Sequence, residues 1–468
     1  MVTEVLDAPE ATGPAGDGPG TAVDGVDAPG RPWWDPLGVV AAGVDWGTGV
    51  VDWSTGTWHR VEKQLARQPL ARVSVAAPRT ARWVVDEVRS RADEVLPGRP
   101  DTRITPGLLG HVALDESIMA MAVGPNRFPR RDDYVRVGAE LTEARAVLEA
   151  GGFLDDPASF HEAPPPLDEP ARTRGWALGT SYERLWWPSG FTPREGLPGG
   201  ERWLGFEANR TASAWVLRHE DRDRPRPWLV CIHGFGTGSV FMDLVGFRAK
   251  HLHETLGVNV AAIVLPAHGA RRPSRISGEE FLSFDLVNSL HGLTQAVWDI
   301  RRLLGWVRTQ DPTHVGVFGI SLGGMLTALT TALEPDLDLA LAGIPMADFP
   351  DLIRRHSPHH LHLRAIEHHI LDGTAQDVHR VVSPLAMAPV TPRDARAIFA
   401  GMGDRLATAD QARRLWDHWQ QPEMCWFPGS HVGYLWSDKA WRFVDDCVRS
   451  RGLAVEPDVP VRAAKSTH

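Results

Sequence analysis

The stretch that decides the fold, HVGVFGISLGGMLTALT, occupies residues 314–330 and carries the pattern Gly-x-Ser-x-Gly at residues 319–323. Its first part is a short apolar run typical of a buried strand, and its last part has the composition of a helix. A serine raised on so sharp a strand-to-helix turn needs small residues two positions before and after it, because larger side chains would collide across the bend. Gly319 and Gly323 meet this requirement, so the stretch predicts that Ser321 is an exposed nucleophile. The alternative is an ordinary turn in another α/β fold.

Strands and helices alternate around this stretch. Nearly continuous apolar runs, such as PWLVCIHG and VNVAAIVLPAHG, are typical of parallel strands buried on both faces. A regular apolar stripe over residues 286–307 predicts the clearest helix. The alternation predicts an α/β fold with a mostly parallel sheet and helices on both faces. The runs that contain the expected strands lie at 181–191, 212–220, 227–234, 258–269, 314–318, 337–348, 395–404 and 422–431, the first two as an antiparallel pair.

Two polar side chains follow the last two expected strands. Asp404 comes at the end of ARAIFAGMGD, and His431 comes at the end of PEMCWFPGSH. Serine is a poor nucleophile at neutral pH, so a histidine must accept its proton and an acid must orient that histidine. Parallel strands end at the same edge of a sheet, which predicts that both side chains lie beside Ser321. Asp404 as a helix cap or turn residue is the alternative, and Asp348 is the rival acid.

Backbone N–H groups near the serine are candidates to stabilise an oxyanion. The amide of Leu322 directly follows the nucleophile at the start of a helix, and we expect it to be one donor. The loop His233-Gly234-Phe235-Gly236 follows the strand at 227–232 and leaves its amides accessible. We expect Phe235 to supply the second donor, with Gly236 as the next choice. The alternative is a glycine-rich strand exit that serves only for turning.

The order of these motifs resembles that of the α/β-hydrolase superfamily over roughly residues 180–450. The matching patterns are His-Gly-x-Gly, Gly-x-Ser-x-Gly, Gly-x-x-Asp ending at Asp404 and Pro-Gly-x-His ending at His431. The resemblance implies an eight-stranded, mostly parallel sheet with a lid between strands six and seven, at about 350–392. It also implies that Ser321 is the nucleophile, Asp404 the acid and His431 the base. Dehalogenases and epoxide hydrolases with this fold use an aspartate at the nucleophile position, so Ser321 argues against both.

These residues predict a serine hydrolase of the carboxylesterase or lipase type that cleaves a small-molecule acyl ester or related carbonyl substrate. The reaction would pass through an acyl-enzyme and needs neither a metal nor an organic cofactor. The same three side chains serve thioesterases, peptidases and acyltransferases, and these alternatives stay open. An α/β-hydrolase scaffold that only binds a partner is the alternative outside enzymes.

The length of 468 residues predicts more than one unit, at a prior of roughly 150 residues per domain. Residues 1–32 are rich in Gly, Pro, Ala and Asp and predict a disordered tail. Residues 33–175 have helical patterns without a readable motif and predict a helical accessory domain. The hydrolase domain is expected at 176–452 and a flexible tail at 453–468.

The net charge of −10 and the absence of a basic stripe argue against nucleic-acid binding. No apolar run approaches the 18 residues of a membrane span, and the N-terminus lacks the features of a signal peptide, which predicts a soluble cytoplasmic protein. The three cysteines lack metal-ligand spacing and are expected to be reduced core residues. The oligomeric state stays open.

Seven histidines fall within the expected lid, at 356, 359, 360, 362, 368, 369 and 379. Histidines with nearby carboxylates such as Glu367 bind zinc or nickel in some proteins. Their spacing matches no known zinc motif, so a polar helical lid is the preferred interpretation and metal binding stays open. Protonation of the cluster is a hypothesis for a lid that loosens at acid pH.

Overall fold

The described part of the chain contains one sheet of nine strands. The computed structural model describes residues 76–93, 100, 102–122, 129–221, 223–357 and 359–455. The tail expected at 1–32 lies outside these residues, and only 453–455 of the tail expected at 453–468 are described. The strands are β1 (Ala171–Ala177), β2 (Thr180–Pro188), β3 (Thr211–Leu217), β4 (Trp228–Ile232), β5 (Asn259–Val264), β6 (Val315–Ile320), β7 (Leu339–Gly343), β8 (Arg396–Gly401) and β9 (Glu423–Phe427).

The strand order is β1-β2-β3-β5-β4-β6-β7-β8-β9. All neighbouring pairs from β5/β4 to β8/β9 are parallel, and the pairs β1/β2, β2/β3 and β3/β5 are antiparallel. The mostly parallel sheet and the antiparallel pair formed by β2 and β3 are therefore as predicted. Because β4, β6, β8 and β9 run in one direction, the loops at their carboxyl ends lie at one edge of the sheet.

The edge strand β1 makes the sheet one strand larger than the eight expected. It pairs with β2 through a two-residue turn, in which Leu178 and Gly179 both have positive φ, at 53° and 74°. Such a turn matches the twist of the flanking strands. The strand has the sequence ARTRGWA and is largely exposed. It lacks the apolar alternation that marks a strand in a sequence, and it places the start of the sheet before the boundary expected at 176.

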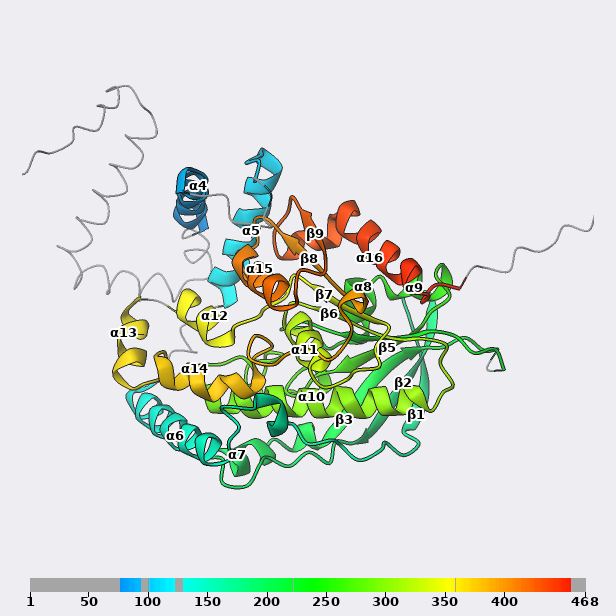
Figure 1. Cartoon of the computed structure of the whole chain (residues 1–468), viewed down its shortest axis with the longest axis horizontal. Coiled ribbons are helices and arrows are strands. Elements are labelled where there is room, and N and C mark those ends of the chain that lie inside the picture. The colour runs from blue at the N-terminus through cyan, green and yellow to red at the C-terminus, as the bar shows by residue number, and fades with distance from the viewer. Residues whose placement is uncertain are drawn as a thin grey trace, which may run out of the picture. The chain divides into compact units, whose positions relative to one another are not determined.

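The two faces of the sheet are covered by separate apolar cores. On β4, Val230 and Ile232 pack into one core and Leu229 and Cys231 into the other, as the period-two alternation of a strand requires. The first core contains helices α6, α10 and α11, and the second contains α9 and α16. Figure 1 shows α10 and α16 on opposite sides of the sheet.

The helices follow the apolar periodicity of the sequence. The stripe expected over 286–307 forms α10, which begins after Asp285, whose side chain accepts a hydrogen bond of 3.0 Å from the Asn288 amide. The helix bounds are α4 (Ala76–Asp93), α5 (Pro106–Ala122), α6 (Arg131–Ala150), α7 (Gly200–Leu204), α8 (Val240–Gly246), α9 (Ala249–Glu254), α10 (Leu286–Arg308), α11 (Leu322–Thr331), α12 (Phe349–His356), α13 (His359–Glu367), α14 (Gly373–His379), α15 (Ala409–His418) and α16 (Asp438–Ser450).

Two groups of helices extend beyond the sheet and its direct cover. The chain between β7 and β8 forms α12, α13 and α14, in the interval expected to be the lid. The region expected to be a helical accessory domain, 33–175, is described only in part, and its described residues contain α4, α5 and α6. Residues 33–75 of that prediction lie outside the described residues. Helix α6 contributes Tyr134, Val137 and Leu141 to the core that also contains α10. Helix α5 lies beside the loops that follow β8 and β9 (Figure 1).

Candidate active site

Ser321 lies at the turn between β6 and α11 with an unusual backbone. Its φ of 60° and ψ of −115° fall in a region that non-glycine residues rarely adopt. A Cβ atom at Gly319 would collide with the carbonyl group of Gly323, and a Cβ at Gly323 would collide with the carbonyl of Ile232. Both glycines are therefore required by close backbone approach, which is the role expected of them as supporting residues of the turn.

A continuous chain of hydrogen bonds joins Ser321, His431 and Asp404. The His431 Nε2 atom lies 2.9 Å from Ser321 Oγ, and His431 Nδ1 lies 2.7 Å from Asp404 Oδ2. A carboxylate can only accept, so Nδ1 carries the proton and Nε2 faces the serine hydroxyl as an acceptor. The structure thus brings together the three side chains that the strand order predicts, from loops that follow β6, β8 and β9.

The carboxylate of Asp404 is held from behind by the main chain. Its Oδ1 atom accepts hydrogen bonds of 2.9 Å from the amides of Leu406 and Ala407, and the residue is 3% exposed. The rival acid Asp348 has other partners: its Oδ1 caps α12 at the Asp351 amide and its Oδ2 pairs with Arg414 at 2.9 Å. The geometry therefore favours Asp404 over Asp348 as the partner of His431.

The environment of His431 raises its pKa above the ordinary value. Burial of the imidazole opposes the charged form, but the negative charge of Asp404, the hydrogen bond from Nδ1 to Asp404 and the charge of Asp115 together outweigh it. An imidazole with these neighbours is well suited to accept a proton and to hold it during a reaction.

The loop expected to supply an oxyanion donor lies against the serine turn. An ideal Cβ at Gly234 would be 3.3 Å from Ser321 Cβ, which places the two loops in contact. The amides of Phe235 and Leu322 have no acceptor among the described residues, so both are available to a ligand. Their role as oxyanion donors stays a prediction.

His233 holds this loop in place. Its Nε2 accepts a hydrogen bond of 3.1 Å from the Leu265 amide, so the proton resides on Nδ1, which donates to the Gly234 carbonyl at 2.8 Å. The Thr237 hydroxyl donates to the same carbonyl at 2.8 Å. Gly236 has a φ of 83°, a value that favours glycine. His233, Gly234 and Gly236 are thus joined within one loop, and their role as supporting residues of the turn stays a prediction.

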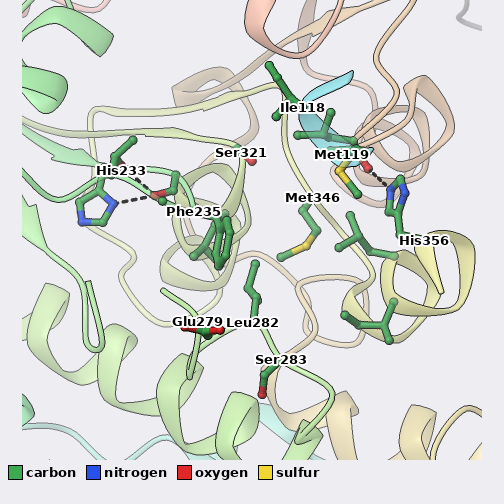
Figure 2. Close-up of a pocket in the computed structure, with 18 of the residues that line it drawn as sticks. Ile118, Met119, His233, Phe235, Glu279, Leu282, Ser283, Ser321, Met346 and His356 are labelled. Atoms are coloured by element: carbon green, nitrogen blue, oxygen red, sulfur yellow. Dashed lines mark hydrogen bonds between the residues drawn. The ribbon is translucent and has the colours of Figure 1, made fainter. Parts of the chain in front are cut away.

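A cavity of about 1290 Å³ opens beside Ser321. Figure 2 shows Ile118 and Met119 of α5 on the opposite side of this cavity from His233 and Phe235, with Ser321 and Met346 between them in the view. Most of the wall is apolar, with side chains from α5, α8, α11 and α12. The charged residues of the wall include Arg130, Asp133, Arg136, Arg202, Glu279, Glu280 and Asp285.

Residues of α5 at the site were not identified from the sequence. Ile118 and Met119 line the cavity, and the side chain of Asp115 contacts the loop that carries His431. A usable signal does exist in the helix PGLLGHVALDESIMAMA, because Asp115 shares a stripe with the buried Leu108 and Val112. An acid on an apolar stripe indicates a buried polar partner, although the sequence does not identify it.

Three of the described histidines of the lid interval, His356, His369 and His379, make side-chain hydrogen bonds within the protein. His356 contacts the Leu406 carbonyl at 3.0 Å, His369 pairs with Asp372, and His379 contacts the Ala375 carbonyl. Burial lowers the pKa of both His356 and His379 to about 4. These two side chains therefore stay neutral at mildly acid pH. The hypothesis of a lid that loosens at acid pH would require them to become protonated there. Among the described residues, no cluster of three or more His, Cys, Asp or Glu has a geometry suited to a metal ion.

The helices in the part of the chain described by the structure are each too short or too polar to cross a membrane.

Comparison with known proteins identifies a family and several relatives of this chain. Residues 204–345 match the family Alpha/beta hydrolase domain containing 18. The chain is 36% identical over 406 residues to uncharacterized protein MT2702 of Mycobacterium tuberculosis (strain CDC 1551 / Oshkosh), covering 86% of this chain and 97% of that protein. It is 35% identical, with the same coverage, to uncharacterized protein Rv2627c of strain ATCC 25618 / H37Rv. A solved acetyl xylan esterase from Paenibacillus sp. R4 aligns with a TM-score of 0.46 at 15% identity, over 65% of this chain and 93% of the esterase. The chain belongs to the α/β-hydrolase superfamily.

Proposed function

We propose that this protein is a serine hydrolase that cleaves small-molecule acyl esters with a large apolar group. The observation that carries the proposal is the hydrogen-bonded chain from Asp404 through His431 to Ser321 beside a largely apolar cavity. Three side chains with this geometry serve acyl transfer on many unrelated folds. A scaffold used only for binding would not require a strained serine backbone in register with a buried histidine and acid.

In the first half of the reaction, Ser321 Oγ attacks the carbonyl carbon of the ester while its proton passes to His431 Nε2. The imidazolium that forms is stabilised by Asp404. The negative charge that develops on the carbonyl oxygen would be stabilised by the amides of Phe235 and Leu322. Collapse of the tetrahedral intermediate breaks the ester C–O bond, and the departing alcohol takes the proton from His431. An acyl group is then left on Ser321.

In the second half, a water molecule loses a proton to His431 Nε2 and attacks the acyl-enzyme carbonyl carbon. The tetrahedral intermediate collapses, Ser321 recovers the proton, and the carboxylic acid leaves. Ester and water thus give alcohol and acid without a metal or an organic cofactor. Thioesters and amides react by the same steps with a thiol or amine as the leaving group.

The size of the cavity supports the substrate class. A volume of about 1290 Å³ exceeds the roughly 300–1,000 Å³ typical of ligand pockets. Apolar side chains from α5, α8, α11, α12 and α13 would bury a long or bulky hydrocarbon group and exclude water from the reacting carbonyl.

A panel of p-nitrophenyl esters with acyl chains of two, eight and sixteen carbons tests the proposal, with wild type and Ser321→Ala compared. We expect hydrolysis by wild type only, with kcat/KM higher for the longer chains. Turnover that survives in Ser321→Ala would contradict the mechanism. A preference for the two-carbon ester would contradict the substrate class, and a much higher kcat/KM on acyl thioesters would identify a thioesterase instead.

A further inference from the structure

A second buried carboxylate, that of Asp115 on α5, lies beneath His431. Its side chain is fully buried and accepts hydrogen bonds from two loops of the site. Its Oδ2 atom accepts from the amides of His431 at 2.8 Å and Arg405 at 3.1 Å. Its Oδ1 atom accepts from the Ser430 hydroxyl at 2.9 Å and, more weakly, from the Val432 amide at 3.4 Å. One side chain thus joins the loop after β8 to the loop after β9.

We propose that Asp115 is a positioning residue, supplied by the N-terminal helix α5, that sets the orientation of His431 relative to Asp404 and Ser321. The proposal rests on the function proposed above. It assigns α5 a part in the machinery of the site, although Asp115 contacts neither the cavity nor the reacting atoms.

The two loops need such a link because they leave the sheet separately. The pairing of β8 and β9 continues briefly beyond the strands, through hydrogen bonds from the Met402 amide to the Phe427 carbonyl and from the Gly403 amide to the Gly429 carbonyl. Beyond these bonds, the backbone at Arg405 and the backbone at His431 meet at the same carboxylate oxygen. A buried amide without an acceptor is costly, so loss of this oxygen would displace both segments.

Both loops are shaped to receive α5. A Cβ atom at Gly403 would lie 2.7 Å from Leu108 Cδ1 and 2.9 Å from Val112 Cγ2. A Cβ at Gly433 would lie 2.9 Å from His111 Nδ1. A larger residue on either loop would therefore displace the helix or its side chains. The close approach of α5 to the loops that carry Asp404 and His431 is independent of the hydrogen bonds to Asp115 and agrees with them.

Asp115 also contributes to the charge around His431. Burial raises the pKa of Asp115, and so does the nearby charge of Asp404, whereas His431 and the amide donors lower it; the net shift is upward. The hydrogen-bond pattern still favours the ionised form, because the partners of its two oxygens include three amides, which can only donate. The charge of Asp115 in turn raises the pKa of His431.

Other charged groups packed around this point are paired mainly with one another. On α5, Glu116 accepts from Arg405 Nε at 2.7 Å and lies 3.8 Å from Arg79 of α4. On α12, Arg355 and His356 interact electrostatically with Glu116 and Arg405. The ionisable groups that face Asp115 are therefore Asp404 and His431, with His111, Glu116 and Arg405 beside it on α5 and the acid loop.

The test compares Asp115→Asn with wild type and with Glu116→Gln, a matched change of carboxylate to amide at the next position of α5. Asparagine has the same size but presents an NH₂ group to N–H donors. We expect kcat to fall roughly 10- to 100-fold in Asp115→Asn with KM little changed, because a small displacement of the general base has effects of this size. We also expect the acid limb of the kcat/KM profile to move to lower pH. Glu116→Gln should keep the wild-type acid limb.

A second readout does not depend on activity. The imidazole resonance of His431, assigned by its loss in His431→Gln, is titrated by NMR in wild type and Asp115→Asn. We expect a lower pKa in Asp115→Asn, since one of two neighbouring negative charges is removed. If wild type hydrolyses no ester, the proposed function fails while this titration still tests the link between Asp115 and His431. An unchanged pKa of His431 would overturn the proposal. Equal losses of kcat in Asp115→Asn and Glu116→Gln, with the acid limb unshifted in both, would overturn it as well.

Ser430→Ala provides a variant whose folding is less at risk. It removes one hydrogen-bond donor to Asp115 and leaves the carboxylates of Asp115 and Asp404 in place. We expect kcat to fall about five-fold, the effect of one hydrogen bond, with the acid limb unshifted. The proposal would also be overturned if Ser430→Ala had a wild-type kcat and Asp115→Asn either had a wild-type kcat or failed to fold.

Discussion

His431 Nε2 lies 2.9 Å from Ser321 Oγ, although 110 residues separate the two in the chain. The distance is that of a direct hydrogen bond, and the strained backbone of Ser321 directs its hydroxyl toward the imidazole. The opposite ring nitrogen is fixed by Asp404, so the tautomer that can accept the serine proton is already present. The proposed mechanism therefore requires no rearrangement of these three side chains before attack.

The role of Asp404 is tested by Asp404→Asn. The amide cannot stabilise the imidazolium and favours the wrong tautomer of His431, so we expect kcat to fall roughly 10⁴-fold with folding retained. Asp348→Asn is the matched control, because Asp348 caps α12 and pairs with Arg414. Steady-state kinetics with circular dichroism check both variants. Retained turnover in Asp404→Asn would reject the assignment of the acid.

The pH dependence of kcat/KM follows from His431. Only the neutral imidazole accepts the serine proton, so the rate rises as the pH passes upward through the pKa of His431. That pKa is raised above its ordinary value of 6.5, because the charges of Asp404 and Asp115 outweigh burial. We expect the midpoint of the acid limb to lie above pH 6.5 in a profile measured with an ester that does not itself titrate. A midpoint well below this value would show that another group limits the rate.

The contribution of α5 to the cavity is tested by Met119→Trp. The larger side chain fills space that a long acyl chain would occupy. We therefore expect kcat/KM to fall at least ten-fold more for a sixteen-carbon ester than for a two-carbon ester. A difference of this size is roughly the cost of a few lost methylene contacts. Leu363→Trp is the control, since Leu363 is 56% exposed on α13 and does not line the cavity. Equal losses for both esters in Met119→Trp would place the acyl chain elsewhere.

The buried ion pair between Arg271 and Asp299 predicts a large effect on stability. The two side chains are 2% and 0% exposed and lie 2.8 Å apart. Asp299→Ala leaves the Arg271 charge without its partner, and we expect the free energy of unfolding to fall by about 3–5 kcal/mol in urea titrations. Asp417→Ala removes a partner of Arg413 from an exposed pair and should cost under about 1 kcal/mol. Similar losses in both variants would contradict this account.

Features with a local signature could be predicted from the sequence. The turn at Ser321 is recognisable because its geometry requires glycine at two fixed positions. His431 and Asp404 are recognisable because each follows an apolar strand. Alternation of strands and helices is enough to predict a mostly parallel sheet. Given those elements, the meeting of these residues at one edge of the sheet follows.

Features that depend on tertiary contacts could not be predicted. Strand β1 has an arginine-rich, exposed sequence and exists because it pairs with β2 through a tight turn. The sequence around Asp115 does not identify its hydrogen-bond partners, because they lie some 290 to 317 residues further along the chain. The sequence indicates only an acid on an apolar helix, and the fold places it beneath His431.

Covalent labelling tests the central claim most directly. The purified protein is treated with a fluorophosphonate probe, which reacts with activated serines, and the modified residue is mapped by mass spectrometry. Ser321→Ala is compared with Ser283→Ala, because Ser283 also lines the cavity. We predict labelling at Ser321 in wild type and in Ser283→Ala, and none in Ser321→Ala. Absence of label on folded wild-type protein, or label that persists in Ser321→Ala, would contradict the assignment of Ser321 as the nucleophile.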